Sequence, residues 1–184
     1  MLFYNNTILS ETFAAGTSNT HWRNNLILGE NALPAIFSVT TFTEYTSSDY
    51  NGFRPNPGVA ASFRWSAPRR GVVADYNGPG RTAELEAREF ATLEEYSAAT
   101  GQDRNSVLVD YDVFLNVPML DARDAETVQE IYEAADFDFR LRPGSGAVDR
   151  GTPLAQVTDG FSGRAPDLGA LELGAPYPVY GPRP

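Results

Sequence analysis

NNTIL at residues 5–9 and NNLIL at residues 24–28 are the two stretches on which the expected fold depends. Their paired asparagines are 19 residues apart, and a looser copy, SDYNGF at residues 48–53, has its asparagine 26 residues further on. Repeats of about 20 residues are typical of solenoids, in which each copy forms one coil. An asparagine side chain can hydrogen-bond to the equivalent asparagine of the next coil, so the spacing predicts a stacked asparagine ladder.

Each asparagine pair is followed by an apolar run that predicts a short strand. The inward side chains of such a strand fill the solenoid core and leave one rung of a parallel sheet. The alternative is a set of antiparallel hairpins with asparagine-rich turns. Two-residue hairpins favour an Asn-Gly or Asp-Gly pair, however, and neither NN stretch has one. We therefore expect stacked parallel strands.

The rest of the chain predicts further strands and two helices. Strand-forming residues dominate at 36–45, near 61–65 and at 105–115. The clearest helix covers residues 92–100, because a T-x-x-E capping box opens it and a glycine follows it. A weaker helical pattern, with apolar residues at helical spacing, covers residues 124–135.

A chain of 184 residues can bury one core, so we expect a single domain over residues 1–184. Its expected parts are regular coils at 1–53, an irregular excursion at 54–91, a short helix at 92–101, and closing strands with a tail at 102–184.

Charge and composition exclude several function classes. The 24 acidic and 14 basic residues give a net charge of −10, which repels the phosphate backbone and argues against a nucleic-acid partner. The sequence has no lysine and no cysteine, so lysine bases, thiolate nucleophiles and disulfides are excluded within it. No apolar run approaches the roughly 20 residues needed to span a bilayer, and the start does not resemble a signal peptide.

The C-terminal third carries a resemblance to a known family. Its motifs are DFRLRPGSGAVDRG at residues 138–151 and PDLGALE at residues 166–172. They resemble the closing segment of right-handed parallel β-helix repeat proteins of the polysaccharide lyase-like superfamily. Gly146 departs from the family pattern, and residues 124–135 have no match in it.

The resemblance implies a mostly β fold: right-handed parallel β-helix coils, a short helix and a Pro/Gly-rich C-terminal wrapping segment. It also implies an extracellular or periplasmic setting. A solenoid that begins with a complete strand leaves its first coil open. We therefore expect upstream β-helix coils of the same protein, or a second copy of this chain, as a partner at that end.

Two functions follow from this resemblance. The first is binding or processing of polysaccharide, by a lyase- or glycosidase-like protein whose catalytic groups lie mainly upstream. The alternative is a noncatalytic glycan-binding or structural surface protein, so enzymatic activity stays open. We assign no catalytic residue within this chain.

Five residues are candidates for polysaccharide binding. Arg69 and Arg70 can hold a sugar carboxylate through bidentate hydrogen bonds, although a solvated loop pair is the interpretation that we favour. Trp65, Tyr50 and Tyr76 can stack against the apolar face of a pyranose ring. The competing interpretations are packing for Trp65 and turn chemistry for the two tyrosines, each of which lies in a DYNG sequence.

Asp110 and Asp112 are the candidate metal ligands. On a strand, residues two apart project to the same face, where two carboxylates can hold Ca²⁺, the one candidate cofactor. The alternative is a solvated face with Val109, Tyr111 and Val113 turned inward. No other metal or cofactor is indicated.

Three further residues have structural interpretations. His21, the single histidine, is interpreted as a turn or surface residue rather than a catalytic one. The turn context of Asp149 and Asp167 predicts that both cap the backbone.

Overall fold

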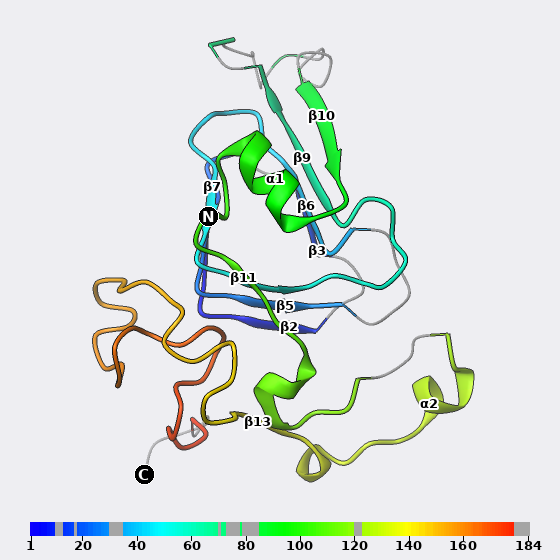
Figure 1. Ribbon diagram of the computed structural model, residues 1–184, viewed down its shortest axis with the longest axis vertical. Helices are drawn as coiled ribbons and strands as arrows, with labels where there is room; N and C mark the ends of the chain where they lie inside the picture. Colours follow the sequence, from blue (N-terminus) through cyan, green and yellow to red (C-terminus); the bar gives the residue numbers. More distant parts are fainter. Residues whose placement is uncertain are drawn as a thin grey trace.

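The computed structural model describes residues 1–9, 13–16, 18–29, 35–69, 71–72, 78, 85–119 and 123–178. Its strands form four small sheets (Figure 1). The first sheet is parallel and contains β1 (Leu2–Tyr4), β4 (His21–Arg23) and β7 (Ser47–Asp49). The second is parallel and contains β2 (Thr7–Leu9), β5 (Leu26–Leu28), β8 (Gly52–Arg54) and β11 (Val107–Leu108).

The third sheet combines both strand directions. Its parallel strands are β3 (Phe13–Gly16), β6 (Phe37–Thr40) and β9 (Phe63–Pro68), and β10 (Leu85–Phe90) pairs with β9 in the antiparallel direction. The fourth sheet is an antiparallel pair of β12 (Phe114–Asn116) and β13 (Asp138–Leu141). The helices are α1 (Leu93–Thr100) and α2 (Ala125–Gln129), with 3-10 turns η1 (Tyr111–Val113) and η2 (Ala134–Asp136).

The predicted fold class is therefore wrong. The described chain is mixed α/β, with mostly parallel sheets of two to four strands and two helices, rather than a β-helix solenoid. The NN repeats correctly indicate parallel pairing, but they report only on the strands next to them. From residue 85 onward the chain adds two antiparallel pairings, both helices and long stretches without strands, for which the repeats carry no information.

The predicted asparagine ladder is confirmed. Asn6 Nδ2 donates to Asn25 Oδ1 at 2.9 Å, and Asn25 Nδ2 donates to Asn51 Oδ1 at 2.8 Å. The chain of hydrogen bonds then ends on a carboxylate, because Asn51 Nδ2 donates to Asp103 Oδ1 at 3.0 Å. In each asparagine of the ladder, the side-chain NH2 group donates to the side-chain oxygen of the next residue. The last residue of the ladder therefore needs only to accept a hydrogen bond. A carboxylate does this without adding donors of its own, so Asp103 suits this position better than a further asparagine.

Burial of Asp103 makes this ladder sensitive to pH. The side chain is 2% exposed, and its burial raises the pKa of the carboxyl above the usual 3.8. Hydrogen bonds from Ser106 and Asn51 lower this pKa, but the effect of burial is larger. The raised pKa means that the folded state holds the proton more tightly than the unfolded state. Stability from this group is thus greatest below 3.8 and falls as the pH rises through the folded-state pKa.

We expect Asp103→Asn to remove this contribution. The amide oxygen still accepts from Asn51, while the buried charge is gone. Urea unfolding of both proteins from about pH 3 to about pH 7 should show the wild type losing stability relative to the variant as the pH rises. A difference that stays constant over this range contradicts the assignment, because other titrating groups cancel between the two proteins.

The main core is an aromatic cluster made by Trp22, Phe37, Phe53, Phe63, Trp65 and Tyr96. Strands of the first three sheets and helix α1 contribute to it. Trp22 stacks on Phe3 with ring centroids 4.0 Å apart, and Tyr96 stacks on Phe63 at 5.2 Å. Such pairs add to the apolar area that the rings bury. The cluster therefore joins the sheets to one another and to the helix.

Helix α1 begins and ends as predicted. Thr92 Oγ1 accepts from the amide of Glu95, and the Glu95 side chain accepts from the amide of Thr92, which completes the capping box. Gly101 ends the helix in the left-handed region, with φ of 75° and its amide bonded to the Ser97 carbonyl. Tyr96 points into the aromatic cluster and holds the helix against β9 and β10.

The helix predicted over residues 124–135 is wrong in extent. Helix α2 has five residues, and the separate 3-10 turn η2 follows it. The apolar residues at helical spacing do not form a buried face, since Val128 is 52% exposed and Ile131 is 90% exposed. Without a partner surface, the apolar stripe has nothing to stabilise a longer helix.

The predicted strands have mixed outcomes. Strand β6 lies inside 36–45, and β9 starts at Phe63 and so lies slightly beyond the expected 61–65. The continuous strand expected over 105–115 is wrong. Asp110 caps the 3-10 turn η1 by accepting from the Tyr111 amide at 2.8 Å, and that turn separates β11 from β12.

The C-terminal segment packs back onto Asn24, the first asparagine of the second pair. Thr152 N donates to Asn24 Oδ1 at 2.8 Å, and the amide of Gly169 donates to the Asn24 carbonyl. At Gly169, where φ is 93°, an added Cβ would lie 2.7 Å from Leu26 and Thr7 side-chain atoms, which explains the glycine. The segment is thereby fixed to β2 and β5.

The prediction that Asp149 and Asp167 cap the backbone is confirmed. Asp167 Oδ1 accepts from the Asp149 amide at 2.7 Å, and its Oδ2 accepts from the Leu173 amide. Asp149 Oδ1 accepts from the amide of Arg164 at 2.7 Å, and this bond lowers the pKa of the Asp149 carboxyl. Both carboxylates therefore hold turns.

Candidate functional site

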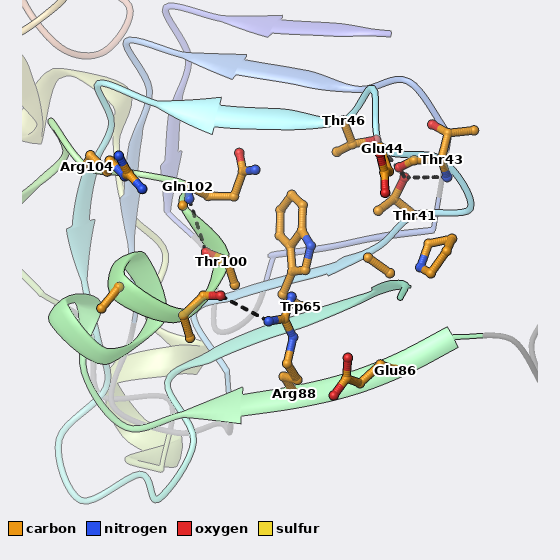
Figure 2. Close-up of a pocket in the computed structure, with 15 residues that line it drawn as sticks. Thr41, Thr43, Glu44, Thr46, Trp65, Glu86, Arg88, Thr100, Gln102 and Arg104 are labelled. Atoms are coloured by element: carbon orange, nitrogen blue, oxygen red, sulfur yellow. Dashed lines mark hydrogen bonds between the residues drawn. The ribbon is translucent and has the colours of Figure 1, made fainter. Parts of the chain in front are cut away.

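A polar cavity of about 470 Å³ lies between the C-terminal end of α1, strands β9 and β10, and the turn after β6 (Figure 2). The side chains that define it are Thr41, Glu44, Thr46, Trp65, Glu86, Arg88, Gln102 and Arg104. The size falls within the range of about 300–1,000 Å³ typical of small-molecule sites. Four separate stretches of chain meet there, so the cavity exists only in the folded protein.

Trp65 forms the aromatic wall of the polar cavity. Figure 2 shows its indole ring at the centre of the lining side chains. The side chain is only 4% exposed, and its ring lies 6.2 Å from that of Tyr96. Trp65 therefore offers an edge to the cavity and keeps most of its surface in the aromatic cluster.

Charges of both signs surround this wall. Glu86 and Arg88 are two residues apart on β10, which places them on one face of the strand. Arg88 Nη1 also donates to the Ala99 carbonyl at 3.1 Å, near the negative end of α1. Across the cavity, Glu44 Oε1 accepts from the Gly71 amide at 2.9 Å. With Arg104, two carboxylates face two guanidinium groups, so the lining is neutral in sum.

Neutral polar groups fill the gaps between the charges. The hydroxyls of Thr41 and Thr46 lie 2.7 Å apart, and Thr41 Oγ1 donates to the Thr43 carbonyl. Gln102 Oε1 accepts from the Ser48 amide at 2.8 Å, which ties the residues after α1 to β7. The arrangement holds hydrogen-bonding side chains in fixed positions, which suits recognition of a polyhydroxylated ligand.

The structure brings only one of the predicted binding residues into this cavity. Trp65 lines it, whereas Tyr50 and Arg69 are not among its lining residues. Tyr50 occupies the turn between β7 and β8, with φ of 55°, and its carbonyl accepts from the Asn24 amide. Arg69 is exposed after β9. The predicted sites Arg70 and Tyr76 lie outside the described residues.

The predicted metal ligands Asp110 and Asp112 do not lie on a strand face. Asp110 caps the turn η1, and its Oδ1 also accepts from Arg54 Nε at 2.9 Å. Asp112 lies within that turn and is exposed, while Tyr111 and Val113 are buried, as the alternative interpretation expected. Among the described residues, no group of three or more His, Asp or Glu side chains is arranged to hold a metal ion. A calcium site at these two aspartates stays a prediction.

The other lining residues were missed by the sequence interpretation. Glu86 and Arg88 had a usable signal, since charged residues alternate in LEAREF at 85–90 and predict a polar strand face. Glu44 and Arg104 gave none, because each lies in a loop whose path depends on tertiary packing.

Across the described residues, no helix has the length and apolar character needed to cross a membrane.

Comparisons with known proteins add no ligand or activity to this geometry. No protein-family model matches the chain, and no curated protein or solved structure shows significant similarity to it.

Proposed function

We propose that the polar cavity binds a short segment of a polysaccharide. The observation that carries this proposal is the meeting of Trp65 with two carboxylates and two guanidinium groups in one hollow. Sugar hydroxyls both donate and accept, so they pair with carboxylate acceptors and guanidinium donors together. A polysaccharide ligand also agrees with the extracellular or periplasmic setting that the sequence resemblance implies.

Charge favours a neutral glycan over a polyuronate. The lining is balanced, with Glu44 and Glu86 against Arg88 and Arg104. The whole chain carries a net charge of −10, which repels a polyanion at long range. A polyuronate would need Arg88 or Arg104 to pair with each carboxylate it brings into the cavity.

Binding is tested with single substitutions at the exposed rim. We expect Arg104→Ala and Glu86→Ala each to weaken binding of a neutral oligosaccharide about tenfold, since each removes a charge-assisted hydrogen bond. Isothermal titration with a panel of neutral and uronate oligosaccharides measures the effect. Arg164→Ala, an exposed arginine of the C-terminal segment, is the matched control and should leave binding unchanged.

The same titrations separate the alternatives. Absence of binding to every member of the panel, or equal binding by wild type and both cavity variants, contradicts the proposal and favours a structural role. Release of new reducing ends by the wild type, lost in Glu86→Ala, instead indicates hydrolysis in this cavity.

A further inference from the structure

Four polar side chains that do not line the polar cavity converge at the first sheet. His21 on β4 and Ser47 on β7 are register partners, and His21 Nδ1 lies 2.9 Å from Ser47 Oγ. On the other side of the ring, His21 Nε2 lies 2.9 Å from Asn19 Oδ1. Arg23 Nη2 donates to Ser47 Oγ at 3.0 Å. The chain neighbours of Ser47, Thr46 and Ser48, are buried, whereas Ser47 is only half-buried and so turns toward the surface.

These contacts favour one neutral tautomer of His21. Asn19 Oδ1 can only accept, so the neutral imidazole carries its proton on Nε2. Nδ1 is then an acceptor. Because Arg23 occupies one lone pair of Ser47 Oγ as a donor, the serine hydroxyl is left to donate to His21 Nδ1. This is the arrangement of a serine nucleophile with a base and a group that orients the base.

We propose that Ser47 is the nucleophile of an acyl-transfer site that hydrolyses carboxylic esters, with His21 as general base. Asn19 orients the imidazole, and the Arg23 guanidinium stabilises the oxyanion. This site is independent of glycan binding in the polar cavity, and either can fail without the other.

Ester hydrolysis at Ser47 requires water as its only reactant besides the ester. Ser47 Oγ attacks the ester carbonyl carbon as its proton passes to His21 Nδ1, and the resulting oxyanion lies within reach of Arg23. Collapse breaks the bond to the leaving alcohol, which takes the proton from His21. Water then attacks the Ser47 ester with His21 again as base, and this step releases the carboxylic acid and restores the serine.

The charges around His21 favour its neutral, basic form. Partial burial lowers the pKa of the ring below the usual 6.5, and Arg23 and the terminal amino group of Met1 act in the same direction. That amino group donates to the Asn19 carbonyl at 2.8 Å. Asp49, the register partner of Arg23, is the facing carboxylate of this sheet and is bonded to Asn105.

The surface beside the cluster can receive an acyl group. Leu2 is the register partner of His21 on β1 and is 62% exposed, so an apolar side chain borders the imidazole. His21 and Ser47 are each half-buried on their strands, so the reacting atoms are reached from the protein surface. We therefore expect small acyl groups, such as acetyl, on accessible hydroxyls.

The first test is covalent labelling of the wild-type protein with an alkyl fluorophosphonate, followed by peptide mass spectrometry. We expect the label on Ser47, and we expect His21→Gln to slow labelling at least about tenfold, because general bases contribute about 10²–10⁴-fold. Ser38→Ala is the matched control, because Ser38 is a half-buried serine on another strand, β6. The chain has one histidine, so no second histidine is available as a control for His21→Gln.

Ester hydrolysis provides a second readout. Turnover of p-nitrophenyl acetate should fall at least about tenfold in Ser47→Ala and be unchanged in Ser38→Ala. Thermal unfolding of each variant shows whether it is folded. If a variant does not fold, the position of the label on the wild-type protein still decides whether Ser47 is the nucleophile. A label on another residue, no label at all, or labelling that His21→Gln does not slow would overturn the proposal.

Discussion

Asn51→Leu is expected to lower the free energy of unfolding by about 4 kcal/mol, because several buried hydrogen bonds of the asparagine ladder are lost together. Asn51 is fully buried and joins both halves of the ladder. Its Oδ1 accepts from the backbone and side-chain amides of Asn25, and its Nδ2 donates to Asp103. Leucine has the same branching and number of side-chain heavy atoms but cannot form hydrogen bonds. The Asn25 backbone amide then loses its side-chain acceptor, and Asn25 Nδ2 keeps only the Phe3 carbonyl. Asp103 keeps its bond from Ser106. Urea unfolding followed by circular dichroism measures the change.

A neighbouring asparagine provides the control for this substitution. Asn105 also makes a side-chain hydrogen bond, from Nδ2 to Asp49 Oδ2 at 2.8 Å, but it is exposed to solvent. Water replaces that bond when it is lost, so Asn105→Ala should cost less than about 1 kcal/mol. Similar losses for Asn51→Leu and Asn105→Ala would show that the ladder is no stronger than a surface contact.

Tyr96→Ala is expected to cost about 4 kcal/mol and to abolish glycan binding in the polar cavity. The ring is fully buried and packs against Phe37, Phe63 and Phe90, so its removal leaves a large void. It also frees α1 from the sheet. Because residues 98–102 at the end of α1 line the cavity, loss of docking displaces them.

The two effects of this substitution are measured separately. Thermal or urea unfolding gives the stability loss, and titration below the unfolding transition gives the affinity of the folded fraction. Tyr45→Ala, at a tyrosine that is 75% exposed, should change stability by no more than about 0.5 kcal/mol. Full glycan affinity in folded Tyr96→Ala would mean that the docked helix is not needed for the cavity.

The polar cavity and the Ser47 site are neighbours in the chain. Thr46 lines the cavity, whereas Ser47, the first residue of β7, does not. A protein that holds a glycan chain at one site and cleaves esters at the other would suit substituted polysaccharides. This link rests on both proposals, and each has its own test above.

The sequence by itself determined the features encoded within a turn or a repeat. The spacing of the NN pairs identified the parallel pairing of β2 with β5 and the ladder from Asn6 to Asn51. The capping box and Gly101 identified both ends of α1, because caps depend on residues three or four apart. Such patterns are local, or they repeat at a constant interval, so they can be read without coordinates.

Tertiary structure alone decided the fold class and both sites. The mixed α/β arrangement depends on where the chain goes after the repeats end, and the repeats do not encode that path. Glu44 and Arg104 both line the polar cavity although they lie far apart in the sequence, and the Ser47 site brings His21 next to Ser47. No sequence motif predicts that these residues lie close together. Packing of the aromatic cluster brings the first pair together, and strand register brings the second, because contacts between distant segments follow from burial of the core rather than from local preference.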